Sequence, residues 1–387
     1  MYRHAMVFGI LAFPMLAQPG HMLAQPGHML AQPALMPAQP GHMPPQPAPE
    51  PPVPSDPLEL IAGNAQPVTA VNQRAEIINL LVHAHQRSNV RAQPYDLKTS
   101  FTVSGPLSSG RWQLEDTSPA SELYRWTVQG PAYSSVNLNI SRVFYSTQPA
   151  TGLPLRLIQV REAIFKTKPV VGPRATLRTA NASLDGVDLV CALIAHNALA
   201  PAGTGGRQWE EQEYCVDPKA GTLITYSAAP GLYFHYDYSQ ALQFHGKLIP
   251  NAFTITQAGQ TVVEAETESV TDPVDNPEAF QTAGLNQIGV GAIMSPAWQY
   301  RVRLPLPGAA PGSPAQVVEL HAVQSPTGEV GDIELLASSD AALNEAAIAF
   351  AAKWQGGMMG QEPQTGATPQ SHEVVMTIEY VGSANPG

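Results

Sequence analysis

The carboxy-terminal part of the chain reads Gln316-Val-Val-Glu-Leu-His-Ala-Val323, then Ser325-Pro-Thr-Gly328, then Glu329-Val-Gly-Asp-Ile-Glu-Leu-Leu336. In the first and third segments apolar and polar residues alternate, which is the pattern of a strand with one buried face. The Pro and Gly between them are typical of a tight hairpin turn. This part of the sequence therefore predicts two antiparallel strands.

A helix and a further strand are predicted after this hairpin. Asp340–Trp354 has apolar residues at helical spacing, and Ser339 or Asp340 can cap its start. The helix residues expected on the sheet are Leu343, Ala347, Phe350, Ala351 and Trp354. The last strand is expected at Glu373–Tyr380, with one face formed by Val374, Met376, Ile378 and Tyr380. Together these elements predict a helix on a three-stranded antiparallel sheet.

This order of elements over residues 316–383 resembles the C-terminal domain of the TonB family, which grips other proteins in the envelope of Gram-negative bacteria. The resemblance implies that an extended segment of an outer-membrane TonB-dependent receptor, or of another envelope protein, joins the sheet through main-chain hydrogen bonds. Unpaired backbone groups on a sheet edge invite such a partner. The edge expected to take it is the last strand, with the contact residues Glu373, Val375, Thr377, Glu379 and Tyr380.

The middle region, residues 58–285, combines two helices with many strands. Helices are predicted over Thr69–Gln86 and Pro154–Phe165. The expected faces are Ile78, Leu81, Val82 and His85 in the first helix, and Leu157, Val160, Arg161 and Ile164 in the second. Strands are predicted at 95–101, 110–115, 123–128, 135–140, 186–194, 211–216, 222–226, 232–238, 247–255 and 261–267.

This succession resembles the periplasmic lipoprotein-carrier fold of LolA and LolB, a curved, incomplete antiparallel barrel plugged by helices. The resemblance implies inward-facing apolar side chains that cradle an acyl lipid or another apolar ligand. Alternatively, the aromatic side chains simply fill the barrel, as interior residues of small barrels usually do. The expected fold class is therefore α+β, a half-barrel with helices followed by the small TonB-like domain.

The amino terminus predicts export. Arg3 and His4 precede about a dozen apolar residues, so residues 1–24 are expected to be a signal peptide, or a short anchor if uncleaved. A seven-residue repeat with Pro in each unit then predicts an extended spacer over 25–57. Residues 286–315 are expected to be a linker with one extra strand at Trp298–Arg303. The expected location is the periplasm, or the inner-membrane surface if the signal stays attached.

The two cysteines, Cys191 and Cys215, lie in predicted strands and have no zinc-site spacing. In an exported protein they are expected to form a disulfide, and the alternative is two unrelated buried thiols. A net charge of -11 without a Lys/Arg cluster argues against nucleic acid as a partner.

No nucleophile elbow, acid pair, phosphate loop or metal spacing is present, so neither enzymatic activity nor a cofactor is expected. Two functions stay open. The first is a TonB-family protein that binds an envelope partner by strand addition, with energy-dependent transport if it is anchored. The second is a lipid or lipoprotein carrier that acts through the middle region.

Overall fold

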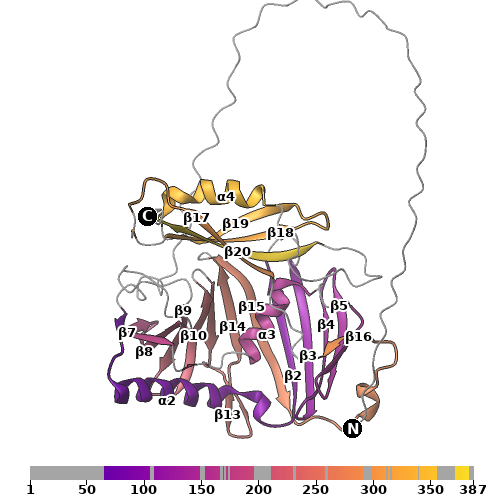
Figure 1. Cartoon of the computed structure of the whole chain (residues 1–387). Helices are drawn as coiled ribbons and strands as arrows, with labels where there is room; N and C mark the ends of the chain where they lie inside the picture. The colour runs from indigo at the N-terminus through magenta and orange to yellow at the C-terminus, as the bar shows by residue number, and fades with distance from the viewer. Residues whose placement is uncertain are drawn as a thin grey trace, which may run out of the picture. The chain divides into compact units, whose positions relative to one another are not determined.

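The computed structural model describes residues 65–382, except for 105–108, 149–152, 166–168, 170, 173–174, 196–210, 230–231, 258–259, 291–297, 311–312, 314–315, 339 and 355–370. The predicted signal segment, 1–24, and the predicted spacer, 25–57, lie outside the described residues. The described part is mostly antiparallel sheet with few helices (Figure 1). Its strands form a 14-stranded sheet, a four-stranded sheet and a two-stranded sheet.

The large sheet has the order β1-β7-β8-β9-β10-β11-β14-β15-β2-β3-β4-β5-β6-β16, and every neighbouring pair in it is antiparallel. Its strands are β1 Gln66–Pro67, β2 Tyr95–Val103, β3 Gly110–Ala120, β4 Leu123–Gln129, β5 Ser134–Ile140, β6 Val143–Ser146, β7 Thr176–Leu184, β8 Val187–Ala195, β9 Glu211–Asp217, β10 Thr222–Ala229, β11 Leu232–Asp237, β14 Ala252–Gln257, β15 Gln260–Thr271 and β16 Asn286–Val290. The two-stranded sheet consists of β12 Leu242–Phe244 and β13 Lys247–Ile249.

One face of the large sheet wraps around two helices, α2 Val71–Ser88 and α3 Leu155–Phe165. Arg161 and Glu162 are neighbours in α3, yet Arg161 lies over the Trp126 ring on β4 and Glu162 accepts a hydrogen bond from the Tyr226 hydroxyl on β10. Six strand-to-strand steps separate β10 from β4 in the sheet order, which in a flat sheet would span about 29 Å at about 4.8 Å a step. The sheet must therefore curve strongly, and its concave side is the apolar one.

The two predicted helices are confirmed, with small differences in which side is buried. In α2 the buried residues are Ile77, Leu81 and Ala84, so the inner face is rotated from the predicted one and shares only Leu81 with it. In α3 residues on nearly every side are buried. Figure 1 shows α3 against the middle strands, where it contacts β14 and β15, and α2 along β9, β10 and β13.

The predicted strands of the middle region are present, and several further strands appear. The predicted strands 211–216 and 222–226 are joined by a tight turn: Gly221 donates its N–H to the Asp217 C=O at 2.8 Å and has a φ of +66°, which favours glycine. The strand predicted at 247–255 is interrupted, because β13 and β14 are separate. Strands β1, β6, β7, β12 and β16 were not predicted.

The small sheet has four strands, not the three predicted, and it is mixed rather than antiparallel. Its order is β17-β20-β18-β19, with the bounds β17 Trp298–Pro305, β18 Gln316–Gln324, β19 Val330–Ser338 and β20 His372–Val381. The extra strand, β17, runs parallel to β20. The predicted linker, 286–315, thus contains two strands, since β16 pairs with β6 of the large sheet and β17 joins the small one.

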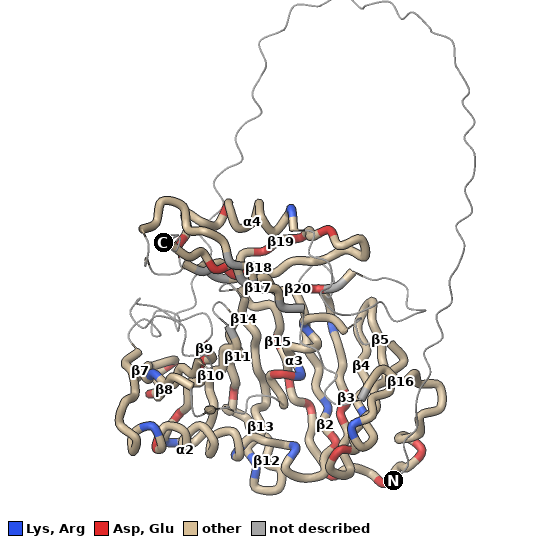
Figure 2. The backbone as a smooth tube through the Cα atoms, viewed as in Figure 1, with Lys and Arg blue, Asp and Glu red and all other residues tan. Residues whose placement is uncertain are grey.

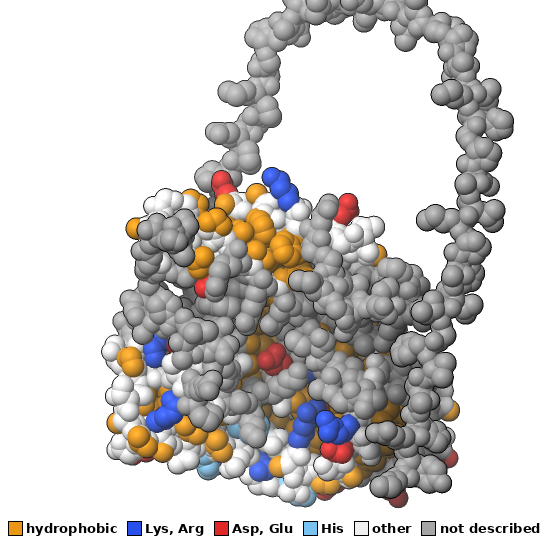
Figure 3. Space-filling view, viewed as in Figure 1, with side chains coloured by type: hydrophobic (Ala, Val, Ile, Leu, Met, Phe, Trp, Pro, Cys, Tyr) orange, Lys and Arg blue, Asp and Glu red, His pale blue; other side chains and the backbone are white. Residues whose placement is uncertain are grey.

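The helix of the small sheet is confirmed as α4 Asn344–Ala352, preceded by a short 3-10 turn at Ala341–Leu343. Asp340 caps this turn by accepting a hydrogen bond from the Ala342 N–H. All five predicted helix residues lie in the apolar cluster with Val318, Leu320, Met376, Ile378 and Tyr380. On the outer side Ile348 is exposed, and apolar side chains gather on the surface around α4 (Figure 3).

Candidate functional site

The concave face of the large sheet carries the largest cluster of buried apolar residues in the described part of the chain. Its buried residues come from β2–β4, β7–β11, β14 and β15 and form one cluster with both helices. The helices complete this cluster with apolar side chains, Ile77, Leu81 and Ala84 from α2 and Leu157, Val160 and Ala163 from α3. Because such contacts are not directional, an apolar ligand could replace them.

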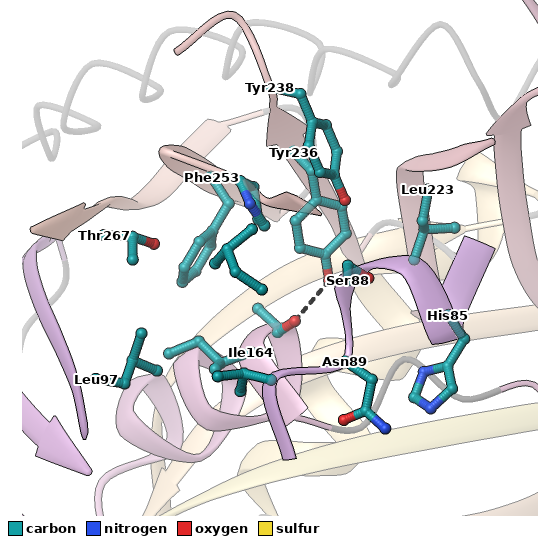
Figure 4. A pocket seen from close by; sticks show the side chains of 14 residues that line it. His85, Ser88, Asn89, Leu97, Ile164, Leu223, Tyr236, Tyr238, Phe253 and Thr267 are labelled. Carbon is teal, nitrogen blue, oxygen red and sulfur yellow. Dashed lines mark hydrogen bonds between the residues drawn. The ribbon is translucent and has the colours of Figure 1, made fainter. Parts of the chain in front are cut away.

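A cavity lies between the end of α2, the last turns of α3 and the strands β11 and β14 (Figure 4). Its wall is mainly apolar and includes Leu97, Ile164, Leu223, Ile249 and Phe253. Polar groups come from the end of α2 and the neighbouring strands: His85, Ser88, Asn89, Tyr236, Tyr238 and Thr267. Figure 4 shows Tyr236 and Tyr238 next to one another, with Ser88 close by. An apolar wall with a few grouped polar side chains is the usual composition of a small-molecule site.

The cavity is small in this conformation. The cavity volume is about 30 Å³. A cavity needs about 10–15 Å³ to hold one buried water. The space thus suits two or three waters and is too small for an acyl chain. A larger apolar ligand would have to displace α2 or α3 from the sheet.

Hydrogen bonds tie the C-terminal end of α3 to two buried tyrosines of the sheet. The Tyr236 hydroxyl donates to the Ala163 C=O at 3.0 Å, as the dashed line in Figure 4 shows. The Tyr226 hydroxyl donates to Glu162 Oε1 at 3.1 Å. Burial raises the pKa of both phenols well above the ordinary value, and the charge of Glu162 adds to the effect. Both hydroxyls therefore stay protonated donors at neutral pH.

A buried ion pair fixes α3 to the sheet at a second point. Arg161 Nη1 lies 2.5 Å from Asp116 Oδ2 on β3, and the two side chains are 5% and 0% exposed. Asp116 Oδ1 also accepts a hydrogen bond from the Tyr95 hydroxyl at 2.7 Å. The Arg161 guanidinium lies 4.3 Å from the centre of the Trp126 ring. Figure 2 shows acidic and basic residues on α3, which lies against the middle strands of the large sheet. Helix α3 is thus held to the sheet by directional polar contacts as well as by apolar packing.

The predicted disulfide is confirmed. Cys191 on β8 and Cys215 on β9 are direct cross-strand partners and are joined by a disulfide bond. Both side chains are buried with Leu189 and Tyr233, in a cluster separate from the cavity. Ligand atoms of the two cysteines and Glu213 lie within 4.8 Å of one another, but the disulfide uses both sulfurs. The role of this bond in the described fold is structural.

The predicted partner-binding strand is not an edge, so this prediction is wrong. β20 pairs with β17 on one side and with β18 on the other over nearly its whole length. Its backbone N–H and C=O groups are used by its own chain, which leaves no row of unpaired groups for a foreign strand. The edges of the small sheet are β17 and β19.

The side chains predicted to contact a partner do not form an exposed surface. Glu373 and Tyr380 are buried, and Tyr380 lies in the cluster under α4. Val375 and Glu379 are half-buried, and the side chain of Thr377 lies outside the description. Strand addition at β20 has no support from this geometry.

Sequence reasoning missed the polar partners of α3, although one signal pointed to them. Arg161 shares a predicted helix face with Leu157 and Val160. A charged residue on an apolar face requires a buried partner. Asp116 lies 45 positions away in the sequence, and no local pattern links the two residues.

None of the helices in the described part of the chain is long and apolar enough to cross a membrane. No protein-family model matches the chain, and the search of curated proteins found no match.

Among solved structures, the chain is similar to a LolA superfamily protein from Nitrosomonas europaea, with a TM-score of 0.36 and 11% identity over 52% of this chain and 96% of that chain. It is also similar to a domain described as an outer membrane lipoprotein-sorting protein from Vibrio parahaemolyticus, with a TM-score of 0.34 and 8% identity over 51% of this chain and 93% of that chain. The first bears the superfamily name that the sequence resemblance gave for the middle region. At these TM-scores and identities the likeness assigns the chain neither a family nor a function.

Proposed function

We propose that this protein is a periplasmic carrier that holds the acyl chain of a lipid or lipoprotein against the concave face of its large sheet. The observation that carries this proposal is the continuous apolar face, lined by many strands and covered by two helices that pack apolar side chains on it. In this conformation α2 and α3 occupy the place of the ligand. These helices must therefore move before the ligand can bind.

The energetics of exchange support this reading. Burial of each CH₂ group stabilises a complex by about 0.8 kcal/mol, so a chain of about 16 carbons contributes about 12 kcal/mol. That gain must offset the apolar contacts that α3 loses on opening, together with the Arg161–Asp116 ion pair and the Tyr236–Ala163 hydrogen bond. The fewer contacts α3 loses on opening, the more of this gain remains to hold the ligand.

The competing view is that the aromatic side chains simply fill the interior and bind no ligand. Purification of the full chain from the periplasm, organic extraction and mass spectrometry of the extract separate the two. Recovery of acyl lipid in about one-to-one ratio supports the carrier. An extract without acyl lipid, together with no uptake of a fluorescent fatty acid by the purified protein, contradicts it.

A pair of matched variants ties any binding to the cavity. Ala163→Phe adds a ring at the buried, cavity-lining end of α3 and should abolish acyl binding. Ala75→Phe adds the same volume on the exposed side of α2 and should leave binding unchanged. Equal binding by both variants would show that the ligand binds elsewhere.

A further inference from the structure

The N-terminal end of α3 contains buried hydrogen-bond donors that the chain does not fully use. Arg156 is 3% exposed, and its Nη1 donates to Gln159 Oε1 at 3.1 Å and to Gln257 Oε1 on β14. Gln257 is 4% exposed, and its Nε2 has no hydrogen-bond partner among the described residues. The charged Arg156 guanidinium on α3 and the Gln257 amide on β14, whose Nε2 has no acceptor among the described residues, thus lie side by side.

The backbone at the same place adds a third donor. The first N–H groups of a helix have no partner within the helix and carry partial positive charge. In α3 the Leu155 N–H donates to Glu373 Oε2 at 2.5 Å. A carboxylate from a residue 218 positions away in the sequence therefore already occupies this end of the helix.

The charge of Arg156 is incompletely balanced. Among the described residues it makes no direct ion pair, and its two acceptors are neutral amides. Burial lowers the pKa of its guanidinium, and the more distant charges of Glu373 and Glu334 oppose that effect. A buried charge that is hydrogen-bonded but unpaired is costly. A phosphate, which accepts two parallel hydrogen bonds from a guanidinium, would complement it directly.

We propose that Arg156, Gln257 Nε2 and the Leu155 amide form a binding site for a phosphate group, and that the Glu373 carboxylate takes the place of that phosphate in the structure. The phosphate comes from the headgroup of an anionic lipid or from free phosphate ion. The lipid source rests on the proposed carrier function, whereas the site itself does not. Phosphate can then bind only after the Glu373 carboxylate has left the Leu155 amide. The site cannot hold the phosphate and the carboxylate at the same time.

The position of the site relative to the cavity fits a lipid. Arg156 and Ala163 lie at opposite ends of α3, seven residues apart, which is about 10 Å along the helix. Ala163 lines the cavity. A lipid with its phosphate at the start of α3 can therefore place its acyl chains along the same helix and over the concave face.

Titration calorimetry with the full chain tests the proposal with three probes: inorganic phosphate, a short-chain phosphatidic acid, and a diacylglycerol of the same chain length. Wild-type protein should bind phosphatidic acid more tightly than diacylglycerol. Glu373→Gln should strengthen the binding of phosphate-bearing probes about tenfold, because a tenfold change needs only about 1.4 kcal/mol and the competing charge is gone. Glu379→Gln, on the same face of β20, is the matched control and should change nothing.

Gln257→Glu is the decisive variant. The new carboxylate pairs with Arg156, so the protein should fold, yet it should repel phosphate and abolish the preference for phosphatidic acid over diacylglycerol. Retention of that preference in Gln257→Glu, or no binding of either phosphate-bearing probe by Glu373→Gln, overturns the proposal. Arg156→Lys should keep part of the affinity as a point charge, whereas Arg156→Gln should lose it.

The probes also separate the two proposals. Equal binding of phosphatidic acid and diacylglycerol supports the carrier and overturns the phosphate site. Binding of inorganic phosphate that Gln257→Glu removes, with no binding of either lipid, supports the site with free phosphate as its ligand and contradicts the carrier.

Discussion

The Arg161–Asp116 ion pair should contribute far more to the stability of this protein than its exposed ion pairs do. Asp116→Ala removes a fully buried carboxylate and leaves the Arg161 guanidinium and the Tyr95 hydroxyl without their acceptor. Removal of one partner of a buried pair typically costs about 3–5 kcal/mol. The Trp126 ring beside Arg161 retains about 1–2 kcal/mol of attraction for the cation, so we expect a value near the lower end.

Urea unfolding measures this cost. The buried indoles of Trp112 and Trp126 report unfolding by fluorescence. Asp188→Ala is the matched control, because Asp188 pairs with Lys219 at 3.1 Å while both side chains are more than 70% exposed. An exposed pair contributes about 0–1 kcal/mol. The reasoning is refuted if Asp116→Ala costs no more than Asp188→Ala.

A second variant separates the loss of the pair from the cost of an unpaired charge. Asp116→Leu combined with Arg161→Leu removes both charges, and it should recover most of the stability that Asp116→Ala loses. If α3 is also the plug of a carrier, Asp116→Ala should speed the exchange of a fluorescent fatty acid. Faster exchange in Asp188→Ala to the same degree would show that general destabilisation, and not the attachment of α3, sets the rate.

Three further outcomes are expected. Replacement of both Cys191 and Cys215 by Ala should lower the free energy of unfolding by about 3.5 kcal/mol in the loop-entropy model, because the bond closes a separation of 24 residues; denaturant titration that gives less than about 1 kcal/mol would contradict this. The raised pKa values of Tyr226 and Tyr236 mean that their neutral forms stabilise the fold fully below about pH 10 and lose that contribution as pH rises further. Phenolate absorbance should therefore rise in two steps, the second together with loss of ellipticity, and Tyr226→Phe or Tyr236→Phe should reduce only the second step. The hydrogen bond from His321 lowers the pKa of Glu334 below its ordinary value of 4.5, so its contribution is present above about pH 4.5 and lost as pH falls through the lower folded value. The stability difference between wild type and Glu334→Gln should shrink on acidification, and a difference that grows would disprove the direction.

Most of the local structure could be predicted from the sequence because it depends on spacing. The faces of β20 and α4 follow from alternation at period two and repetition near 3.6, and the buried residues Val374, Met376, Ile378 and Ala347 lie where those periods put them. The hairpin turn at Gly221 follows from its residue types. The disulfide follows from two cysteines on adjacent predicted strands.

The candidate site was much harder to predict, since its parts come from distant segments. Tyr236, Ala163 and Leu97 meet at one cavity although each lies in a different element. Gln257, at the end of β14, carries no pattern that marks it as a partner of Arg156. The error about β20 has the same origin, because alternation shows which side chains are buried but not which strands lie beside them.

The sequence by itself determined the helices, most strands and the buried faces of β20 and α4. Each of these depends on neighbours within a few turns or residues. Only the tertiary structure decided that β17 runs parallel to β20 and closes its edge, that the large sheet curves around α2 and α3, and that Arg161 meets Asp116. The entropic cost of closing a loop rises only slowly with its length, so many strand orders satisfy the same local pattern and packing over the whole chain selects among them.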